Sequence, residues 1–198
     1  MYVRNIETTG NSNWQGDAYM LDLVHLYNPG VICDFGVGKW GKWGWLIRRS
    51  YDEWKAIHYK ESQALIFGYE GSEKNFEALK MRTQSYGYDD IICADFLRFH
   101  LNYPGDWPTP EVCIFGDSLE HVDYTDAVEL INQLKMFVKK AILVQLPLGE
   151  YEQEVDINPF ENHRSTWGYE EIMHLKPAGL RKFTDFVGRD FVIFSIPI

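Results

Sequence analysis

Segments typical of β-strands alternate with segments typical of α-helices along residues 31–146 of this 198-residue chain. The strand-like segments are short and almost continuously apolar, and the segments between them carry apolar residues at helical spacing. We expect strands over 31–35, 64–70, 90–95, 111–117 and 141–146, with helices over 43–54, 72–83 and 125–138. Continuous apolar strands separated by helices are typical of a parallel sheet that is covered on both faces. The sequence therefore predicts an α/β fold.

The end of the sequence departs from this alternation. Two more strand-like runs, 180–186 and 191–196, are separated only by Val187–Asp190. Because so short a connection cannot cross over a sheet, these two runs must form an antiparallel hairpin. We therefore predict a mostly parallel sheet that ends in an antiparallel hairpin.

A glycine-rich turn follows the first predicted strand, in the stretch Val-Ile-Cys-Asp-Phe-Gly-Val-Gly-Lys-Trp-Gly over residues 31–41. Gly36, Gly38 and Gly41 lack a Cβ, which allows the backbone to turn sharply and to approach a ligand closely. The helix that follows presents free N–H groups and the positive end of its dipole. Such glycine spacing also occurs in ordinary loops, so on its own it is a weak indication of ligand binding.

Acidic residues stand at the ends of four predicted strands: Asp34, Glu70, Asp95 and Asp117. In open α/β sheets, ligands bind beyond the carboxyl ends of the strands, near the point where the strand order reverses. A carboxylate after the second strand suits the two hydroxyls of a ribose. One after the first strand suits an amino group, and one after the third suits the exocyclic amine of adenine. The four acids therefore predict a nucleoside-binding site at this edge.

These motifs resemble the class I, Rossmann-like S-adenosylmethionine-dependent methyltransferases over about residues 30–198. Asp34-Phe-Gly-Val-Gly is similar to the motif that binds the methionine end of the cofactor, Glu70 to the acid that holds its ribose, and Asp95-Phe96 to the pair beside adenine. The run 117–122, Asp-Ser-Leu-Glu-His-Val, is similar to the motif beneath the methyl donor. The resemblance implies a three-layer αβα sandwich with a seven-stranded sheet in the order 3-2-1-4-5-7-6, whose last strand is buried between two others.

The same resemblance assigns the cofactor, S-adenosylmethionine, to one end of the sheet. Lys39 makes the glycine turn bulkier than usual in the family, and we expect its ammonium group to hold the cofactor's carboxylate. The implied cofactor-binding residues are Asp34, Gly36, Gly38, Lys39, Gly41, Glu70, Gly71, Asp95, Phe96, Asp117 and Ser118.

The spacing between the glycine turn and Glu70 departs from the usual pattern. Glu70 lies 34 positions after Gly36, whereas the corresponding acid of dinucleotide folds follows after about 20. We expect the additional residues to lengthen the first helix or to form a surface excursion within 45–63. Glu73 is a poorer candidate for the same role.

Methyl transfer from a sulfonium needs mainly orientation and, for some acceptors, a base. Asp117 and His121 are the candidate catalytic residues, while Glu120 is expected to cap a helix or to be solvated. A long polar loop over 147–168 should lie above the same edge, where an acceptor would enter. The residues expected to shape the acceptor pocket are Gly149, Tyr151, His163 and Trp167.

Composition limits the remaining possibilities. We expect one domain over 1–198, with an N-terminal lid segment over 1–29, a cofactor-binding core over 30–146, and an acceptor loop with the terminal hairpin over 147–198. The formal net charge of −10 disfavours nucleic acid as the partner, so the expected acceptor is a small molecule or a saccharide-like compound. No apolar run is long enough to span a membrane. Histidines, cysteines and carboxylates do not occur together at the spacing of metal ligands, so we expect no metal site.

Three cysteines, Cys33, Cys93 and Cys113, fall inside predicted strands without a C-x-x-C pattern. They are expected to be reduced thiols that pack in the core of a cytoplasmic protein. Two alternative functions stay open at this point. The glycine spacing also fits an NAD(P)-dependent oxidoreductase, although no hydride-transfer motif is evident. Exposure of Trp40, Trp43 and Trp45 would instead favour a non-catalytic binding or scaffold protein.

Overall fold

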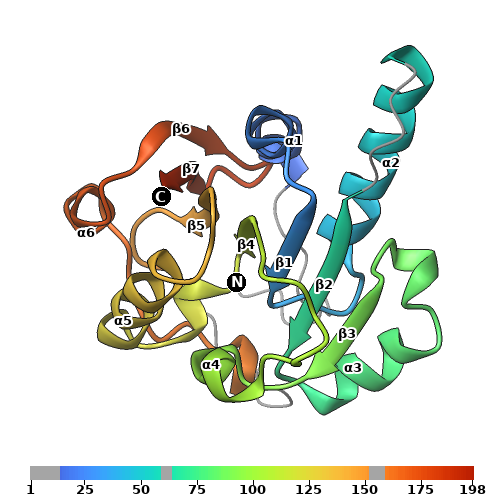
Figure 1. Cartoon of the computed structure of the whole chain (residues 1–198). Coiled ribbons are helices and arrows are strands. Elements are labelled where there is room, and N and C mark those ends of the chain that lie inside the picture. Colours follow the sequence, from blue (N-terminus) through green and yellow to red (C-terminus); the bar gives the residue numbers. More distant parts are fainter. Residues whose placement is uncertain (1–13, 59–63, 152–158) are drawn as a thin grey trace.

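The structure, a computed structural model, describes residues 14–58, 64–151 and 159–198. Seven strands form one sheet in the order β3-β2-β1-β4-β5-β7-β6, as Figure 1 shows. The first five strands are parallel to one another, and β7 is antiparallel to both β5 and β6. This confirms the predicted sheet and its strand order. The strands are β1 (Val31–Phe35), β2 (Leu65–Glu70), β3 (Asp90–Cys93), β4 (Val112–Gly116), β5 (Ala141–Pro147), β6 (Ala178–Thr184) and β7 (Asp190–Pro197).

Helices cover both faces of the sheet, because successive side chains of a strand point to opposite faces and both sets are apolar. One face packs against α1 (Asp17–Tyr27), α2 (Lys42–His58) and α3 (Glu73–Lys80). The other packs against α4 (Phe99–Asn102), α5 (Tyr124–Lys135) and α6 (Tyr169–His174). In Figure 1, α1 and α2 lie on one side of the strands, and α4 and α5 on the other. The arrangement is the predicted three-layer sandwich.

Strand β7 lies inside the sheet. It pairs with β5 along its whole length and with β6 on its other side, and residues 191–196 are all buried. This confirms the expectation that the second run of the hairpin is inserted between two neighbours. The hairpin thereby completes the core rather than extending it at an edge.

Helix α2 explains the unusual distance between the glycine turn and Glu70. It runs for 17 residues, Lys42–His58, and extends beyond the helix predicted over 43–54, so part of the additional sequence lengthens the first helix as expected. Residues 59–63 lie outside the described residues. The short helix α4 was not predicted, since it lies in a segment between β3 and β4 that is rich in turn residues.

Helix α1 packs on the sheet. It contacts α2, β5 and β7, and Asp17 at its start forms an ion pair of 2.5 Å with Lys42, directly after the glycine turn. The described part of the expected N-terminal lid thus lies against one face of the sheet, with its first residue near the glycine turn, and a lid role stays a prediction. Among the described residues, none of the helices combines the length and the apolar character needed to cross a membrane.

The cysteines divide into two groups. All three are free thiols; Cys33 and Cys113 are buried opposite each other on β1 and β4, but Cys93 is exposed. The expectation that all three fill the core was therefore wrong for Cys93. It ends β3, which is an edge strand of the sheet, so one of its flanks has no neighbouring strand to cover it.

Candidate functional site

The four strand-end acids lie next to one another at the carboxyl edge of the sheet. Because β3, β2, β1 and β4 are consecutive neighbours, the acids in or just after their carboxyl-terminal ends are arranged in the spatial order Asp95, Glu70, Asp34 and Asp117. This order is produced by the reversal of strand order at β1 and β4, which is where α/β sheets bind ligands. The sheet therefore assembles the predicted set from four segments that are distant in sequence.

The glycine turn is bound to the end of β2. The backbone N–H groups of Gly36 and Val37 both donate to the carbonyl oxygen of Tyr69, at 2.9 and 3.1 Å. Gly36 has a φ of 91°, and a Cβ added there would lie 2.6 Å from the Cβ of Ser118. Glycine is therefore required at position 36 both by the backbone conformation and by the close approach of the β4 end.

Glu70 links the glycine turn to helix α3. One carboxylate oxygen accepts the N–H of Gly38 at 2.8 Å, and the other accepts the N–H of Ser72, also at 2.8 Å. Burial raises the pKa of the Glu70 carboxyl, and these two backbone donors lower it in part. Glu73, the poorer candidate, is exposed at the first position of α3. The geometry therefore favours Glu70 as the acid of this site.

Asp34 is completely buried behind the glycine turn. The Tyr88 hydroxyl donates to one of its carboxylate oxygens and accepts the N–H of Gly44. The other oxygen, Oδ1, has no hydrogen-bond partner among the described residues. Burial raises the pKa of Asp34 from 3.8 to about 7, with Glu70 adding to the increase and the Tyr88 hydrogen bond opposing it. Tyr88 was missed because it precedes β3 and reaches Asp34 across the face of the sheet.

The raised pKa of Asp34 predicts a pH-dependent stability. The folded chain holds this proton more tightly than the unfolded chain, so the contribution of Asp34 to stability is full below pH 3.8 and is lost as the pH rises through 7. Asp34→Asn removes the titration. Between pH 5.5 and 8, we expect the variant to gain about 2 kcal/mol relative to the wild type, measured by thermal unfolding of both proteins without ligand. Equal pH profiles would contradict the assignment.

Asp95 and Phe96 follow β3 at the outer end of the acidic row. Asp95 is exposed and accepts the N–H of Leu97, at the start of the short turn Phe96–Arg98. The Phe96 ring is half-buried against Phe35. Asp95 is thus accessible at the edge of the sheet, and Phe96 is partly accessible beside it.

The segment after β4 connects the glycine turn to the acceptor side. The Ser118 hydroxyl donates to the Phe35 carbonyl at 2.7 Å and is buried, so it fixes the turn. Asp117 adopts a φ of 59°, unusual for a residue other than glycine. Its carboxylate accepts the side-chain amide of Gln145 at 2.9 Å. Gln145 is fully buried in β5 and was not identified in the sequence, because it lies inside an apolar strand.

Two histidines and a glutamate meet beside Asp117. Glu120 and His121 belong to the short turn Leu119–His121, and their ligating atoms and those of His163 lie within 4.8 Å of one another. Burial, and then the neighbouring His163, lower the pKa of His121 to about 4. Glu120 is 2 % exposed, so the expectation that it is a cap or solvated was wrong. Burial, and then Asp117, raise its pKa well above the ordinary value.

The described parts of the loop over 147–168 lie across this edge of the sheet. The N–H groups of Arg164 and Ser165 donate to the Glu120 carbonyl, and the Nδ1 of His163 lies 2.8 Å from the Tyr151 carbonyl. A Cβ on Gly71 would lie 3.3 Å from the Phe160 ring, so the loop also reaches the end of β2.

The predicted acceptor residues divide by burial. Gly149, with a φ of 97°, pairs with Trp167, which is fully buried. Tyr151 is half-buried and accepts the N–H of Asp190. Of the four, His163 alone meets the predicted catalytic His121, at 5.1 Å between ring centroids.

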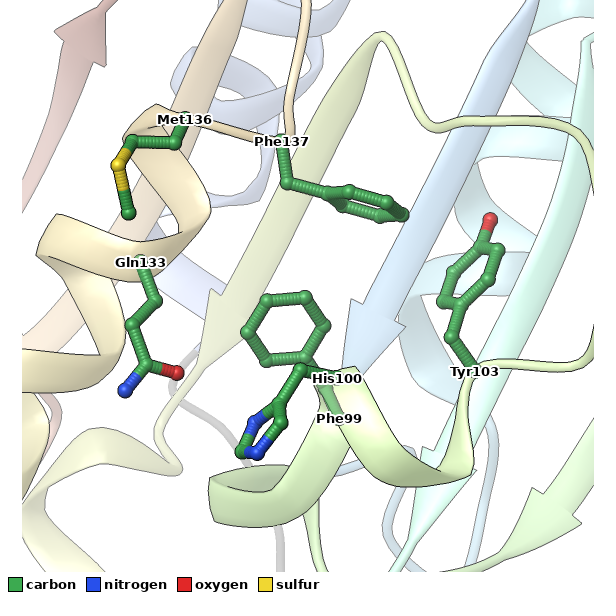
Figure 2. Close-up of a pocket in the computed structure, with 6 residues that line it drawn as sticks. All are labelled: Phe99, His100, Tyr103, Gln133, Met136 and Phe137. Atoms are coloured by element: carbon green, nitrogen blue, oxygen red, sulfur yellow. The ribbon is translucent and has the colours of Figure 1, made fainter.

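A separate hollow of about 480 Å³ lies between α4 and the end of α5. Figure 2 shows the rings of Phe99, Tyr103 and Phe137 around it, and none of its lining residues belongs to the predicted site. Of the three tryptophans near the glycine turn, Trp43 is buried, while Trp40 and Trp45 are 51 % and 45 % exposed. Lys39 lies over the Trp40 ring, at 5.4 Å from its centroid.

Comparison with solved structures shows the same architecture in several proteins at low sequence identity. The methyltransferase domain of bacterial CtHen1-C matches with a TM-score of 0.60 and 15 % identity, over 93 % of this chain and 98 % of that one. Magnesium protoporphyrin IX methyltransferase (ChlM) from Synechocystis PCC 6803, with bound SAH, matches with a TM-score of 0.58 and 16 % identity, over 91 % and 80 %.

A third match is the 1,6-didemethyltoxoflavin-N1-methyltransferase of Burkholderia thailandensis, with a TM-score of 0.60 and 9 % identity, over 90 % and 76 %. Protein-family models gave no match to the sequence, and neither did a search of curated proteins. The strand order, the inserted β7 and these matches establish that the chain has the fold of the class I S-adenosylmethionine-dependent methyltransferases.

Proposed function

We propose that this protein is an S-adenosylmethionine-dependent methyltransferase whose acceptor is a small molecule or a saccharide-like compound. The observation that carries the proposal is the row of acids at the carboxyl edge, in which Glu70 is bonded to the glycine turn through Gly38. A fold alone supports many functions. This row supplies the specific groups that a nucleoside with a charged amino-acid end requires.

The cofactor's polar groups have candidate partners along this row. Each oxygen of Glu70 accepts one backbone N–H, and a carboxylate oxygen can accept a second hydrogen bond, here from a ribose hydroxyl. Asp95 is exposed and suits the exocyclic amine of adenine, with Phe96 beside the ring. The unpartnered Oδ1 of Asp34 suits the cofactor's ammonium group, directly or through water. Lys39, Gly41, Gly71, Asp117 and Ser118 complete the proposed set.

Asp117 and His121 are proposed to act on the acceptor. The Nδ1 of His121 lies 3.3 Å from the Asn162 carbonyl, which can only accept, so this nitrogen carries the proton and Nε2 has the lone pair. In the transfer, an acceptor atom attacks the methyl carbon in line with the bond to sulfur. The protein orients the acceptor and the cofactor's methyl group and excludes water from between them. Where the acceptor atom carries a proton, that proton passes to a base or to solvent.

The solved neighbours support a small acceptor. One is a porphyrin methyltransferase solved with the product S-adenosylhomocysteine, and another is solved with 1,6-didemethyltoxoflavin together with that product. Free thiols at Cys33 and Cys113 agree with a reducing compartment such as the cytoplasm.

Calorimetric titration with S-adenosylhomocysteine tests the proposal, with NADH as the parallel ligand. We expect saturable binding of S-adenosylhomocysteine in the micromolar range and none of NADH. Binding of NADH alone would favour the alternative function, an NAD(P)-dependent oxidoreductase. Binding of neither would favour a non-catalytic role, for which the exposed rings of Trp40 and Trp45 offer a contact surface.

A further inference from the structure

The Glu120, His121 and His163 side chains converge at one point near the carboxyl end of β4. Their potential ligand atoms all lie within 4.8 Å of one another. Ligands of one ion, each bonded at about 2.1 Å, lie at most about 4.2 Å apart, so only a small adjustment of the side chains would let all three bind the same ion. Two imidazoles and a carboxylate are a donor set that first-row transition metals prefer.

Both histidine rings are already oriented for such a role. The Nδ1 of His121 faces the Asn162 carbonyl at 3.3 Å, and the Nδ1 of His163 faces the Tyr151 carbonyl at 2.8 Å. Each carbonyl can only accept, so each Nδ1 carries a proton, and in the neutral form of the ring the lone pair is then on Nε2. A backbone carbonyl that holds the far nitrogen in this way is the usual outer support of a metal-bound histidine.

Glu120 supplies an independent indication of a ligand. Its side chain is 98 % buried, and its Oε2 has no hydrogen-bond partner. Within the described part of the chain, Glu120 takes part in no ion pair. A buried carboxylate oxygen without a donor or a nearby cation is costly. A bound cation at the two imidazoles would remove that cost.

We propose that Glu120, His121 and His163 form a binding site for a divalent transition-metal ion at the acceptor side of the carboxyl edge. Three protein ligands leave at least one coordination position open, as in metal sites that act on a substrate. We expected no metal site from the sequence. His163 is distant in sequence from Glu120 and His121, and it reaches them only when the loop folds over β4.

The position of the ion also indicates the chemical class of the acceptor, a step that depends on the proposed methyl transfer. An open position beside Asp117 would take a hydroxyl oxygen and make its proton more acidic. That oxygen then forms the bond to the methyl carbon while the carbon–sulfur bond breaks and its electron pair stays on sulfur. The hydroxyl proton passes to water, because Nε2 of a metal-bound His121 has no lone pair left to accept it. An acceptor with a hydroxyl group is therefore favoured over one that presents only carbon.

The metal site is tested by titrating the chelator-treated 198-residue chain with ZnCl₂ in a calorimeter and with CoCl₂ by visible absorption. We expect one ion per chain. His163→Ala and the nearly isosteric Glu120→Gln should each weaken zinc binding more than tenfold, and His174→Ala, which alters an exposed histidine on α6, should leave it unchanged. The cobalt spectrum should lose its intensity in the first two variants only.

Absence of saturable zinc binding would overturn the proposal, as would equal affinities of His163→Ala and His174→Ala. Titration of each variant with S-adenosylhomocysteine keeps the two proposals apart. Zinc binding without S-adenosylhomocysteine binding would support the metal site and contradict the methyltransferase function. The reverse result would contradict the metal site alone. Circular dichroism of each variant shows whether it is folded.

Discussion

Glu70→Ala is expected to weaken the binding of S-adenosylhomocysteine more than a hundredfold. The substitution removes the acceptor of two backbone N–H groups, from Gly38 and Ser72, and it removes the proposed partner of the ribose hydroxyls. Hydrogen bonds to a charged group contribute about 1.5–3 kcal/mol each. A hundredfold loss of affinity corresponds to about 2.7 kcal/mol of binding free energy. Losing both the bond that holds the glycine turn and a contact to the ligand exceeds that value.

Glu73→Ala is the matched control, because Glu73 is exposed on the adjacent helix and is the alternative acid for the same role. We expect its affinity for S-adenosylhomocysteine to equal that of the wild type. Calorimetric titration of the three proteins decides between the two acids. Loss of binding in Glu73→Ala with retention in Glu70→Ala would reverse the assignment, and equal affinities of all three would remove both residues from the site.

Phe194→Ala is expected to destabilise the protein by about 3–5 kcal/mol. Phe194 is fully buried on β7, between β5 and β6, in the core that packs against α5. The truncation leaves a cavity in the middle of the sheet, where paired strands on both sides restrict collapse. For a chain of this size, such a change lowers Tm by about 6–20 °C, measured by thermal unfolding.

The control in this case is Phe186→Ala. Phe186 lies in the connection between β6 and β7 and is 78 % exposed, so its removal should change stability by less than about 0.5 kcal/mol. The pair therefore compares the same substitution inside β7 and in the turn of the hairpin. A similar Tm for both variants would mean that β7 does not form part of the core.

The fold was accessible from the sequence because its signals are local. Apolar runs mark the strands, and the predicted connection over Val187–Asp190 is too short for anything but a hairpin. In the structure the connection is Asp185–Arg189, so the predicted strand over 180–186 ran two residues too far. Once the strand order is known, it alone predicts that the acids at the ends of these strands lie side by side. Helix bounds were less certain, since α2 continues to His58 without a residue that would stop it after 54.

The site was less accessible because much of it depends on contacts across the fold. Tyr88 reaches Asp34 from the segment before β3, and Gln145 reaches Asp117 from within an apolar strand. Glu120 looked like a solvated surface residue, yet the loop that carries Arg164 and Ser165 covers it. Neither periodicity nor spacing reports such contacts, which arise only when the loop after β5 folds over the carboxyl edge.

The position of β7 also has a consequence for how the protein is made on the ribosome. Strand β5 pairs with β4 on one side, but its other edge pairs with β7, whose residues are synthesised only after the loop, α6 and β6. Until then β5 presents the unpaired edge of a strand that is apolar except at Gln145. Unpaired apolar edges associate with other chains. The interval between translation of β5 and of β7 is therefore a stage at which nascent chains are exposed to aggregation.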